Sequence, residues 1–247
     1  MASISPDERF SVNSDERCYS FTDTTFIKRE RPLDERPINK WTGEPVVIPW
    51  LPERFQNEAT VLEIIANRTK IPVPKVKDVG RDSSGRWYLV TELVQNAVRA
   101  DMVDDRCWMQ QDHGVYEGSC TACIDIAQTN TDQFIKGTIL PWLSTLRFNS
   151  TAINGFMIPP LWVLRYDKRP TWVPKSSTSD DFVIVHGDLG PHNIMLDQNT
   201  LWPVAVIDWE YACPLPPAFQ RWSATRKGWF SLYDDEQLIR GLIAELS

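Results

Sequence analysis

Two short apolar runs in the last third of the chain restrict its fold more than any other feature. They are Val183–Val185 and Val204–Ile207, and both are rich in β-branched residues, which predicts buried strands. An Asp and an Asn follow the first run at Asp188 and Asn193, and a second Asp, Asp208, directly follows the second run. We therefore expect the ends of two strands to bring two carboxylates and one carboxamide to the same place.

The spacing of these side chains indicates a particular chemistry. His186, Asp188 and Asn193 form the pattern H-x-D-x-x-x-x-N, which is the catalytic-loop pattern of the protein-kinase fold. In phosphoryl transfer from Mg-ATP, one Asp accepts the proton of the substrate hydroxyl, while an Asn and a second Asp bind the metal ion. We predict Asp188 as the catalytic residue, and Asn193 and Asp208 as ligands of Mg²⁺, which binds hard oxygen atoms. Glu210 either adds a carboxylate behind these ligands or forms a solvated salt bridge.

The complete motif resembles a known family of small-molecule kinases. The stretches His186–Asp197 (HGDLGPHNIMLD) and Ile207–Glu210 (IDWE) are similar to aminoglycoside phosphotransferases and choline kinases, and most similar to the fungal branch of that group. The resemblance implies an α+β, protein-kinase-like fold with two lobes, a small sheet-rich N-terminal lobe and a mainly helical C-terminal lobe. It covers most of residues 55–215 and also includes Ile71–Pro74, Pro159–Pro160 and Trp172–Pro174.

The same resemblance implies the activity. The family transfers a phosphoryl group from ATP, with Mg²⁺ as cofactor, to a hydroxyl group of a small molecule. We predict a nucleotide-binding lobe at residues 1–94 and a catalytic and substrate-binding lobe at residues 95–247. The resemblance further implies that His186 supports the catalytic loop by hydrogen bonds without transferring a proton, and His192 is predicted to be a surface residue.

The N-terminal lobe must supply a cation for the phosphates and a glutamate that pairs with it. Lys28 is predicted to be this cation, because Thr25–Lys28 resembles the strand that carries it in the family. Arg29, on the opposite face of the strand, is the alternative. Glu58 is predicted to be the partner of Lys28 on a helix. The predicted adenine contacts are the backbone groups of Glu92 and Val94, in a hinge formed by residues 91–94.

Apolar periodicity predicts the elements around these residues. Residues 17–29 should form two short strands around Thr22–Thr24, and residues 31–52, with five prolines, an irregular connection. Pro52 opens a helix with an apolar face, and a sheet edge is expected near Val73–Val79. That helical face consists of Phe55, Ala59, Leu62, Ile65 and Ala66.

Further strands and helices are predicted towards the C-terminus. Residues 87–93 should form a strand, and a helical stripe runs from Ile135 to Leu146, where Pro141 should kink or delimit the helix. The acids at 234–236 should cap a final helix.

A glycine-rich phosphate loop is absent before Lys28, because the first glycine of the chain is Gly43. Only Asn13–Asp15 or Thr22–Thr24 could cover the phosphates, and each contains an acid that would repel them. The chain also looks short at its N-terminus, as if a first strand were reduced or lost. Two alternatives to a kinase therefore stay open. One is a degraded, pseudokinase-like family member that acts as a binding protein, and the other is a fold recruited for a non-kinase step of small-molecule biosynthesis.

Charge and hydropathy restrict the partners. The net charge of −7 argues against nucleic acid, because a phosphate backbone attracts clustered Lys and Arg. This charge is compatible with a small-molecule substrate, including a cationic one. No apolar run approaches the ~18 residues that cross a bilayer, and residues 1–7 are polar, so we expect a cytoplasmic protein without a membrane partner. Neither the acceptor nor the oligomeric state can be read from the sequence.

Four possible metal ligands lie close together between the two predicted functional segments. Cys107, His113, Cys120 and Cys123 fall within seventeen residues, and the last two form a CxxC pair. Such a set can form a Cys₃His zinc site. The family does not require zinc here, and cysteines are also common as small buried residues, so both interpretations stay open.

Overall fold

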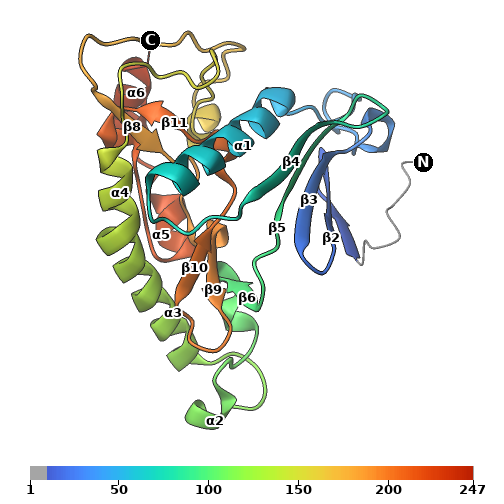
Figure 1. Cartoon of the computed structure of the whole chain (residues 1–247), viewed down its shortest axis with the longest axis vertical. Helices are drawn as coiled ribbons and strands as arrows, with labels where there is room; N and C mark the ends of the chain where they lie inside the picture. Colours follow the sequence, from blue (N-terminus) through green and yellow to red (C-terminus); the bar gives the residue numbers. More distant parts are fainter. Residues whose placement is uncertain (1–9, 247) are drawn as a thin grey trace.

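The computed structural model describes residues 10–246, so the polar N-terminal residues lie outside the described range. An antiparallel sheet with one helix beside it is followed by a larger C-terminal part (Figure 1). The strand order in this sheet is β1-β2-β3-β5-β4. The strands are β1 (Phe10–Asn13), β2 (Arg17–Phe21), β3 (Thr25–Glu30), β4 (Val76–Arg81) and β5 (Trp87–Glu92).

The sheet confirms several predictions of local structure. β2 and β3 form the predicted pair around Thr22–Thr24, and β4 is an edge strand, as the nearby prolines indicated. The first strand, expected to be reduced or lost, is present and short: β1 pairs with β2 in the register Val12↔Tyr19. This strand has only four residues, FSVN, and is too short to produce a clear alternation. Between β3 and the first helix, the predicted irregular connection contains a single turn of 3₁₀-helix, η1 (Leu33–Glu35).

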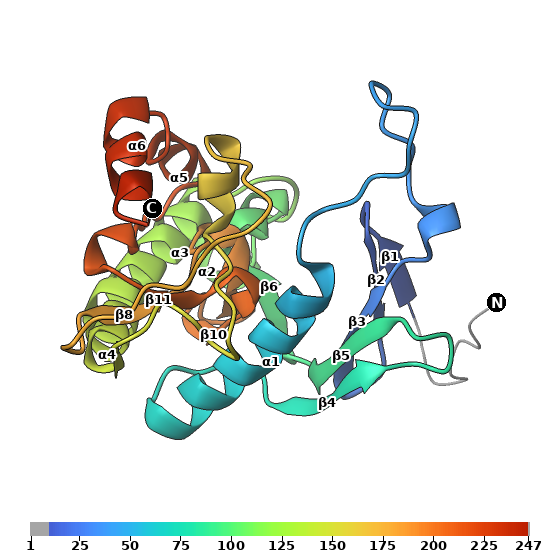
Figure 2. The same cartoon turned by 90° about the horizontal axis from the view of Figure 1, so that it is seen from above.

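Helix α1 (Leu51–Arg68) connects the sheet to the rest of the molecule (Figure 2). Pro52 lies in its first turn, where a missing N–H costs no hydrogen bond. The N-terminal half of α1 packs under the sheet through Leu51, Phe55 and Ala59, and its C-terminal half joins the main core through Val61, Leu62 and Ile65. The predicted apolar face is thus confirmed except for Ala66, which is exposed because it lies beyond the last buried turn.

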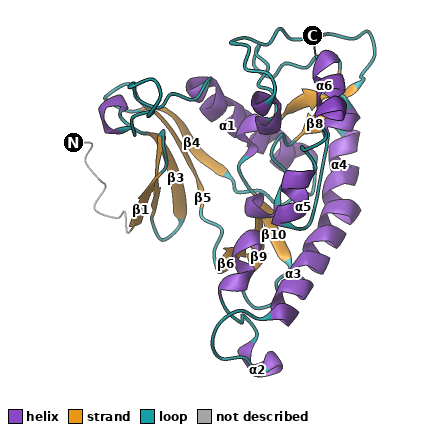
Figure 3. Cartoon of the chain, turned by 180° about the vertical axis from the view of Figure 1, so that it is seen from behind, coloured by secondary structure: helices purple, strands orange, loops and turns teal. Residues whose placement is uncertain are grey.

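The C-terminal part is not mainly helical, which corrects the prediction (Figure 3). It contains two three-stranded antiparallel sheets, β10-β9-β6 and β11-β8-β7. Four prolines between residues 159 and 174, together with short β-branched runs, exclude long helices from much of this region. The strands are β6 (Ala97–Arg99), β7 (Arg147–Phe148), β8 (Phe182–Val185), β9 (Ile194–Asp197), β10 (Pro203–Val206) and β11 (Cys213–Leu215).

One long helical segment runs along the C-terminal part. It consists of α3 (Thr121–Phe134), a π-helical turn η3 (Ile135–Ile139) and α4 (Leu140–Thr145). Pro141 cannot donate a hydrogen bond to the carbonyl four residues earlier, and the chain widens into the π-turn just before it. The helical stripe is therefore confirmed, with Pro141 delimiting α4 as predicted.

The other helices are short. α2 (Gln110–His113) precedes α3, and α5 (Arg226–Ser231) and α6 (Glu236–Ala244) pack on β8 and β11. Asp235 caps α6 by accepting a bond from the Leu238 amide at 3.0 Å, which confirms the predicted acidic cap. Short 3₁₀ segments lie between the other elements: η2 (Ala100–Asp105), η4 (Leu161–Arg165), η5 (Pro191–Asn193), η6 (Trp209–Tyr211) and η7 (Pro217–Phe219). Within residues 10–246, no helix is both long enough and apolar enough to cross a membrane.

Candidate functional site

A cavity of about 430 Å³ lies between the N-terminal sheet and the C-terminal part. One wall consists of side chains from β2, β3 and β5, and the other of side chains from η5, β9 and the residues after β10. Most of the predicted site residues line it, namely Lys28, Glu58, Glu92, Val94, Asn193 and Asp208.

The strand register explains how the sheet forms its wall. Lys28 pairs with Tyr19 on one side and with Leu89 on the other, and all three line the cavity. Two residues away, Phe21, Phe26 and Thr91 form a second row on the same face. Side chains alternate between the two faces of a strand, so Lys28 and Phe26 point to the same side. The aromatic rows were not predicted, although their spacing of two residues was visible in the sequence.

Lys28 is the centre of the charged end of the cavity. Its Nζ lies 2.7 and 2.9 Å from the two carboxylate oxygens of Glu58 and 2.5 Å from Oδ1 of Asp208. The three residues come from β3, α1 and the segment after β10, so one ammonium group links three separate segments of the chain. Arg29, the alternative cation, instead donates to Ser20 Oγ on the neighbouring strand at 3.0 Å.

Charges around Lys28 determine the ionisation of the cluster. Burial lowers the pKa of Lys28, but Asp208 and Glu58 more than offset this effect and raise that pKa above its ordinary value. Burial raises the pKa of Asp208, whereas Lys28 and Arg17 hold that pKa below its ordinary range, so Asp208 is ionised. Burial raises the pKa of Glu58 to about 7, because the attraction of Lys28 offsets only part of its desolvation.

Asn193 and Asp208 lie on the wall that faces the sheet. The Ile207 amide donates to the Asn193 carbonyl at 3.0 Å, which holds the backbone before Asp208 against the backbone of Asn193. Asn193 uses its side-chain nitrogen to donate to the carbonyl and to Oδ2 of Asp188, at 2.9 and 3.2 Å. Asp208 has a positive φ of 64°, an uncommon conformation for a residue with a side chain. Such strained residues are frequent at functional sites.

Asp188 is buried beside Asn193 and is not among the described residues that line the cavity. Both oxygens of Asp188 lie 3.2 Å from Nε2 of His192. Burial raises the pKa of Asp188, although the His192 contact lowers it. The prediction that His192 is a surface residue is wrong. It assumed an extended segment, whereas the 3₁₀ turn η5 directs His192 back to Asp188 and into the cavity wall.

His186 connects the backbone at Asp188 to the backbone of Ile207, the residue before Asp208. Its Nδ1 accepts from the Asp188 amide at 3.3 Å, so Nε2 carries the proton and donates to the Ile207 carbonyl at 3.1 Å. Burial lowers the pKa of His186 to about 4, and the ring is therefore neutral near pH 7. These contacts agree with the supporting role predicted for this histidine. Next to it, Gly187 has φ +79°, and a Cβ there would lie 2.2 Å from the Tyr211 carbonyl oxygen.

Glu210 does not form a solvated salt bridge; it belongs to a buried ion network. Its carboxylate pairs with Arg17 and, at 2.7 Å, with Arg54 of α1. Arg54 also pairs with Glu16 at 2.7 Å. Burial raises the pKa of Glu210, but Arg17 and Arg54 more than offset this effect and leave that pKa below its ordinary value. Beside this network, Asn57 donates to the carbonyls of Glu210 and Ala212 at 3.1 and 2.7 Å. Motif reasoning missed these partners, because each lies far from Glu210 in sequence.

The turn between β1 and β2 is one of the two segments that the sequence offered in place of a glycine-rich loop. It contains the acids Asp15 and Glu16, and the latter is buried against Arg54 and Arg17. Of the described residues that line the cavity, none is an acid from this turn or from the turn at residues 22–24. The acids that were expected to repel phosphates are therefore not part of the cavity wall.

Comparison with known families matches the C-terminal segment. Residues 158–246, a little over a third of the chain, match the sequence model of the phosphotransferase enzyme family. The matched segment includes Asp188, Asn193 and Asp208 and excludes the N-terminal sheet with Lys28. A comparison with curated protein sequences finds no match.

Several solved structures are similar at low identity. A Ralstonia eutropha protein assigned as an aminoglycoside phosphotransferase is 16% identical, with a TM-score of 0.47 over 87% of this chain and 63% of that chain. This chain therefore spans less than two thirds of that protein. Aminoglycoside-3'-phosphotransferase of type VIII is 18% identical, with a TM-score of 0.45 over 85% of this chain and 74% of that one.

A third similar structure is the GDP and kanamycin complex of APH(2")-IIia. It is 12% identical, with a TM-score of 0.48 over 98% of this chain and 78% of that chain. At this level of similarity, neither the activity nor the ligands of these proteins transfer to this chain.

Proposed function

We propose that this protein is an ATP- and Mg²⁺-dependent phosphotransferase of the aminoglycoside phosphotransferase and choline kinase group, acting on a hydroxyl of a small molecule. One observation carries the proposal. Lys28 pairs with Glu58 and with Asp208 at the wall of a cavity that also contains Asn193. This is the arrangement of cation, helix glutamate and metal-binding acid on which kinase activity depends. Membership of the fungal branch and the division at residue 94 stay predictions.

In this proposal the adenine occupies the apolar end of the cavity. Phe21, Phe26 and Thr91 line that end on the sheet side, and Met195 and Ile207 face them. The adenine edge would bind the backbone of Glu92 and Val94, which also line the cavity. Among the described residues, the Val94 amide has no hydrogen-bond partner, so it can donate to a ligand. Lys28 would bind the phosphates.

The chemistry of Asn193 and Asp208 fits Mg²⁺. Both offer oxygen atoms, and the low pKa of Asp208 keeps it anionic. Asn193 uses its amide nitrogen for Asp188, so its amide oxygen would be the ligand. When bound, Mg²⁺ would offset the negative charge of the phosphates. The carboxylates of Glu58 and Glu210 lie close to Asp208, but Lys28, Arg17 and Arg54 already neutralise them.

Asp188 is the proposed acceptor of the substrate proton. Its carboxylate already binds His192 and Asn193, so the substrate hydroxyl would take the place of His192 at one oxygen. A general base must lie within hydrogen-bond reach of the proton that it removes. The identity of the acceptor stays open; the net charge of −7 is compatible with a cationic one.

Nucleotide binding and transfer test the proposal separately. ATP with Mg²⁺ should raise the melting temperature of the wild-type chain, because a ligand that binds only the folded state stabilises it. Asp188→Asn should keep this shift and lower phosphoryl transfer by about 10²–10⁴, measured with radiolabelled ATP and a panel of amino alcohols and aminoglycosides. Asp180→Asn, at an exposed position, is the matched control and should change neither result.

The alternatives give different results. No shift with ATP and Mg²⁺ at millimolar concentration would contradict the proposal and favour a binding protein without nucleotide. Product formation in the presence of a chelator would instead favour a recruited, non-kinase enzyme.

A further inference from the structure

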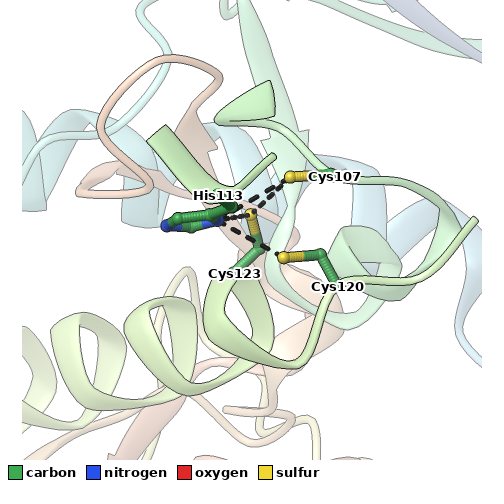
Figure 4. Close-up of side chains that lie close together, drawn as sticks. All are labelled: Cys107, His113, Cys120 and Cys123. Carbon is green, nitrogen blue, oxygen red and sulfur yellow. Dashed lines mark hydrogen bonds between the residues drawn. The ribbon is translucent and has the colours of Figure 1, made fainter. Parts of the chain in front are cut away.

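The four predicted metal ligands of the segment 107–123 converge on one point (Figure 4). Nδ1 of His113 lies 3.3 Å from the sulfur of Cys120, 3.4 Å from that of Cys123 and 3.7 Å from that of Cys107. The sulfurs of Cys107 and Cys123 are 3.8 Å apart. All four ligand atoms lie within 4.8 Å of one another.

These distances are those of a tetrahedral zinc site. With Zn–S near 2.3 Å and Zn–N near 2.0–2.1 Å, tetrahedral geometry separates two sulfurs by about 3.8 Å and a sulfur from the nitrogen by about 3.5 Å. The observed separations of 3.3–3.8 Å agree with both values. A disulfide would need two sulfurs about 2.05 Å apart, and all of these cysteines are free thiols.

Ordinary packing does not account for the arrangement. The three cysteines are buried at the edge of the main core, where single thiols commonly serve as small apolar groups. An apolar pocket, however, does not attract an imidazole that directs one nitrogen at three sulfurs at once. Further polar contact comes from the Trp108 amide, which donates to the Cys123 sulfur at 3.4 Å, as in many metal–thiolate centres.

The ligands come from three consecutive elements of the chain. Cys107 follows η2, His113 ends α2, and Cys120 and Cys123 lie at the N-terminus of α3, whose dipole favours thiolates. Between the second and third ligands the chain is mostly exposed, with positive φ at Gly114 and Gly118. A segment as exposed as residues 114–119 cannot be held in place by a hydrophobic core of its own, whereas a metal ion bound on both sides of the segment can hold it.

We propose that Cys107, His113, Cys120 and Cys123 bind one structural Zn²⁺ ion. On binding, the three thiols lose their protons and the neutral imidazole binds through Nδ1, so four protein ligands fill the coordination shell. A closed shell of this kind stabilises a fold and leaves no open coordination position for catalysis. The ion would connect η2, α2 and α3. Since η2 also packs against η5, which carries Asn193, the zinc site supports the back of the catalytic segment. This proposal does not depend on the proposed function.

The unaltered chain tests this proposal first. Protein purified without chelators from zinc-supplemented medium should contain about one zinc ion per chain by elemental analysis. After zinc removal under reducing conditions, Co²⁺ should bind with the sulfur-to-metal charge-transfer absorption of a three-thiolate site. Neither measurement requires nucleotide, so failure here is distinguishable from failure of the kinase proposal.

Variants then assign the ligands. Cys120→Ser and His113→Ala should each lose most of the zinc, whereas Cys213→Ser and Cys18→Ser, which alter cysteines outside the cluster, should keep it. Sub-stoichiometric zinc below about 0.1 per chain together with no Co²⁺ absorption would overturn the proposal. A disulfide among the three cysteines in the native protein, detected as a mass loss of two hydrogens, would also overturn it. The Co²⁺ spectrum decides the question even if a variant fails to fold.

Discussion

At the scale of single residues, the segment around Asp188 depends on a glycine, because no side chain fits at position 187. Gly187 has φ +79° between His186 and Asp188, and its missing side chain lets the Tyr211 carbonyl approach. The same glycine therefore places both neighbours, one towards Ile207 and the other towards Asn193. The sequence motif identified His186 and Asp188 by the chemistry of their side chains. The close approach of the Tyr211 carbonyl explains why the residue between them is a glycine.

Gly187→Ala should lower the free energy of unfolding by roughly 3 kcal/mol or more, since positive φ costs about 1–2 kcal/mol and the clash adds to it. Gly85→Ala is the matched control, with the same φ of +79° and nothing within 4 Å of the added Cβ. It should show only the conformational cost. Urea denaturation measures both variants, and equal losses would contradict the importance of the contact with Tyr211.

His186 should make stability depend on pH. Burial lowers its pKa to about 4 in the folded state, below the ordinary value near 6.5. The unfolded chain then binds a proton that the folded chain does not, so this contribution is complete above pH 6.5 and is lost as the pH falls towards 4. Between pH 7.5 and 5, the wild type should lose about 2 kcal/mol more than His186→Gln. The titration of the other groups contributes equally to both proteins and therefore cancels in this comparison. Equal losses of unfolding free energy in the wild type and in His186→Gln would contradict the prediction.

At the scale of elements, helix α1 determines the geometry of the site. It carries Glu58 towards Lys28, and one turn earlier it carries Arg54 between Glu16 and Glu210. Asn57 between them binds the backbone carbonyls of the segment after Asp208. A single helix thus holds Asp208, which follows β10, in a constant position relative to Lys28 of β3.

Arg54→Gln should destabilise the protein by about 3–5 kcal/mol, because it leaves two buried carboxylates without one of their cations. Arg68→Gln on the exposed end of the same helix is the matched control and should cost less than about 1 kcal/mol. Denaturation of both variants near pH 7 measures the difference. A small effect of Arg54→Gln would mean that Arg17 alone neutralises both acids.

At the scale of the whole molecule, the N-terminal strands are held to the rest by contacts distant in sequence. β3 pairs with β5 along its length, and Arg17 and Lys28 bind acids of the C-terminal part. The connection after β3 has few such contacts. At its tip, between the bridged residues Ile38 and Pro45, Trp41 is 93% exposed.

Limited chymotrypsin digestion should therefore cut first after Trp41, since exposed loop tips are preferred sites of proteolysis. The two fragments should stay together in size-exclusion chromatography, because the sheet and the buried ion pairs connect them. Trp41→Ser should slow this cut without changing the melting temperature. Initial cleavage within β2 or α1, or separation of the fragments, would contradict the described packing.

Much of the fold and of the candidate site follows from local patterns. The strands around Thr22–Thr24, the start of α1 at Pro52 and the role of Pro141 were predictable, because propensity and periodicity act over a few residues. The mainly helical C-terminal part was a wrong prediction, because it came from the resemblance and not from the short runs themselves. His192 was misplaced because a single 3₁₀ turn reverses its direction.

The sequence by itself determined which groups are candidates for the proposed chemistry: Asp188, Asn193 and Asp208 by their spacing, and Cys107, His113, Cys120 and Cys123 by their residue types. Only the tertiary structure decided how they meet. It placed Lys28 between Glu58 and Asp208, buried Glu210 among arginines, and directed one imidazole at three sulfurs. The physical reason is that such contacts join residues far apart in the chain, and their geometry depends on how whole elements pack against one another.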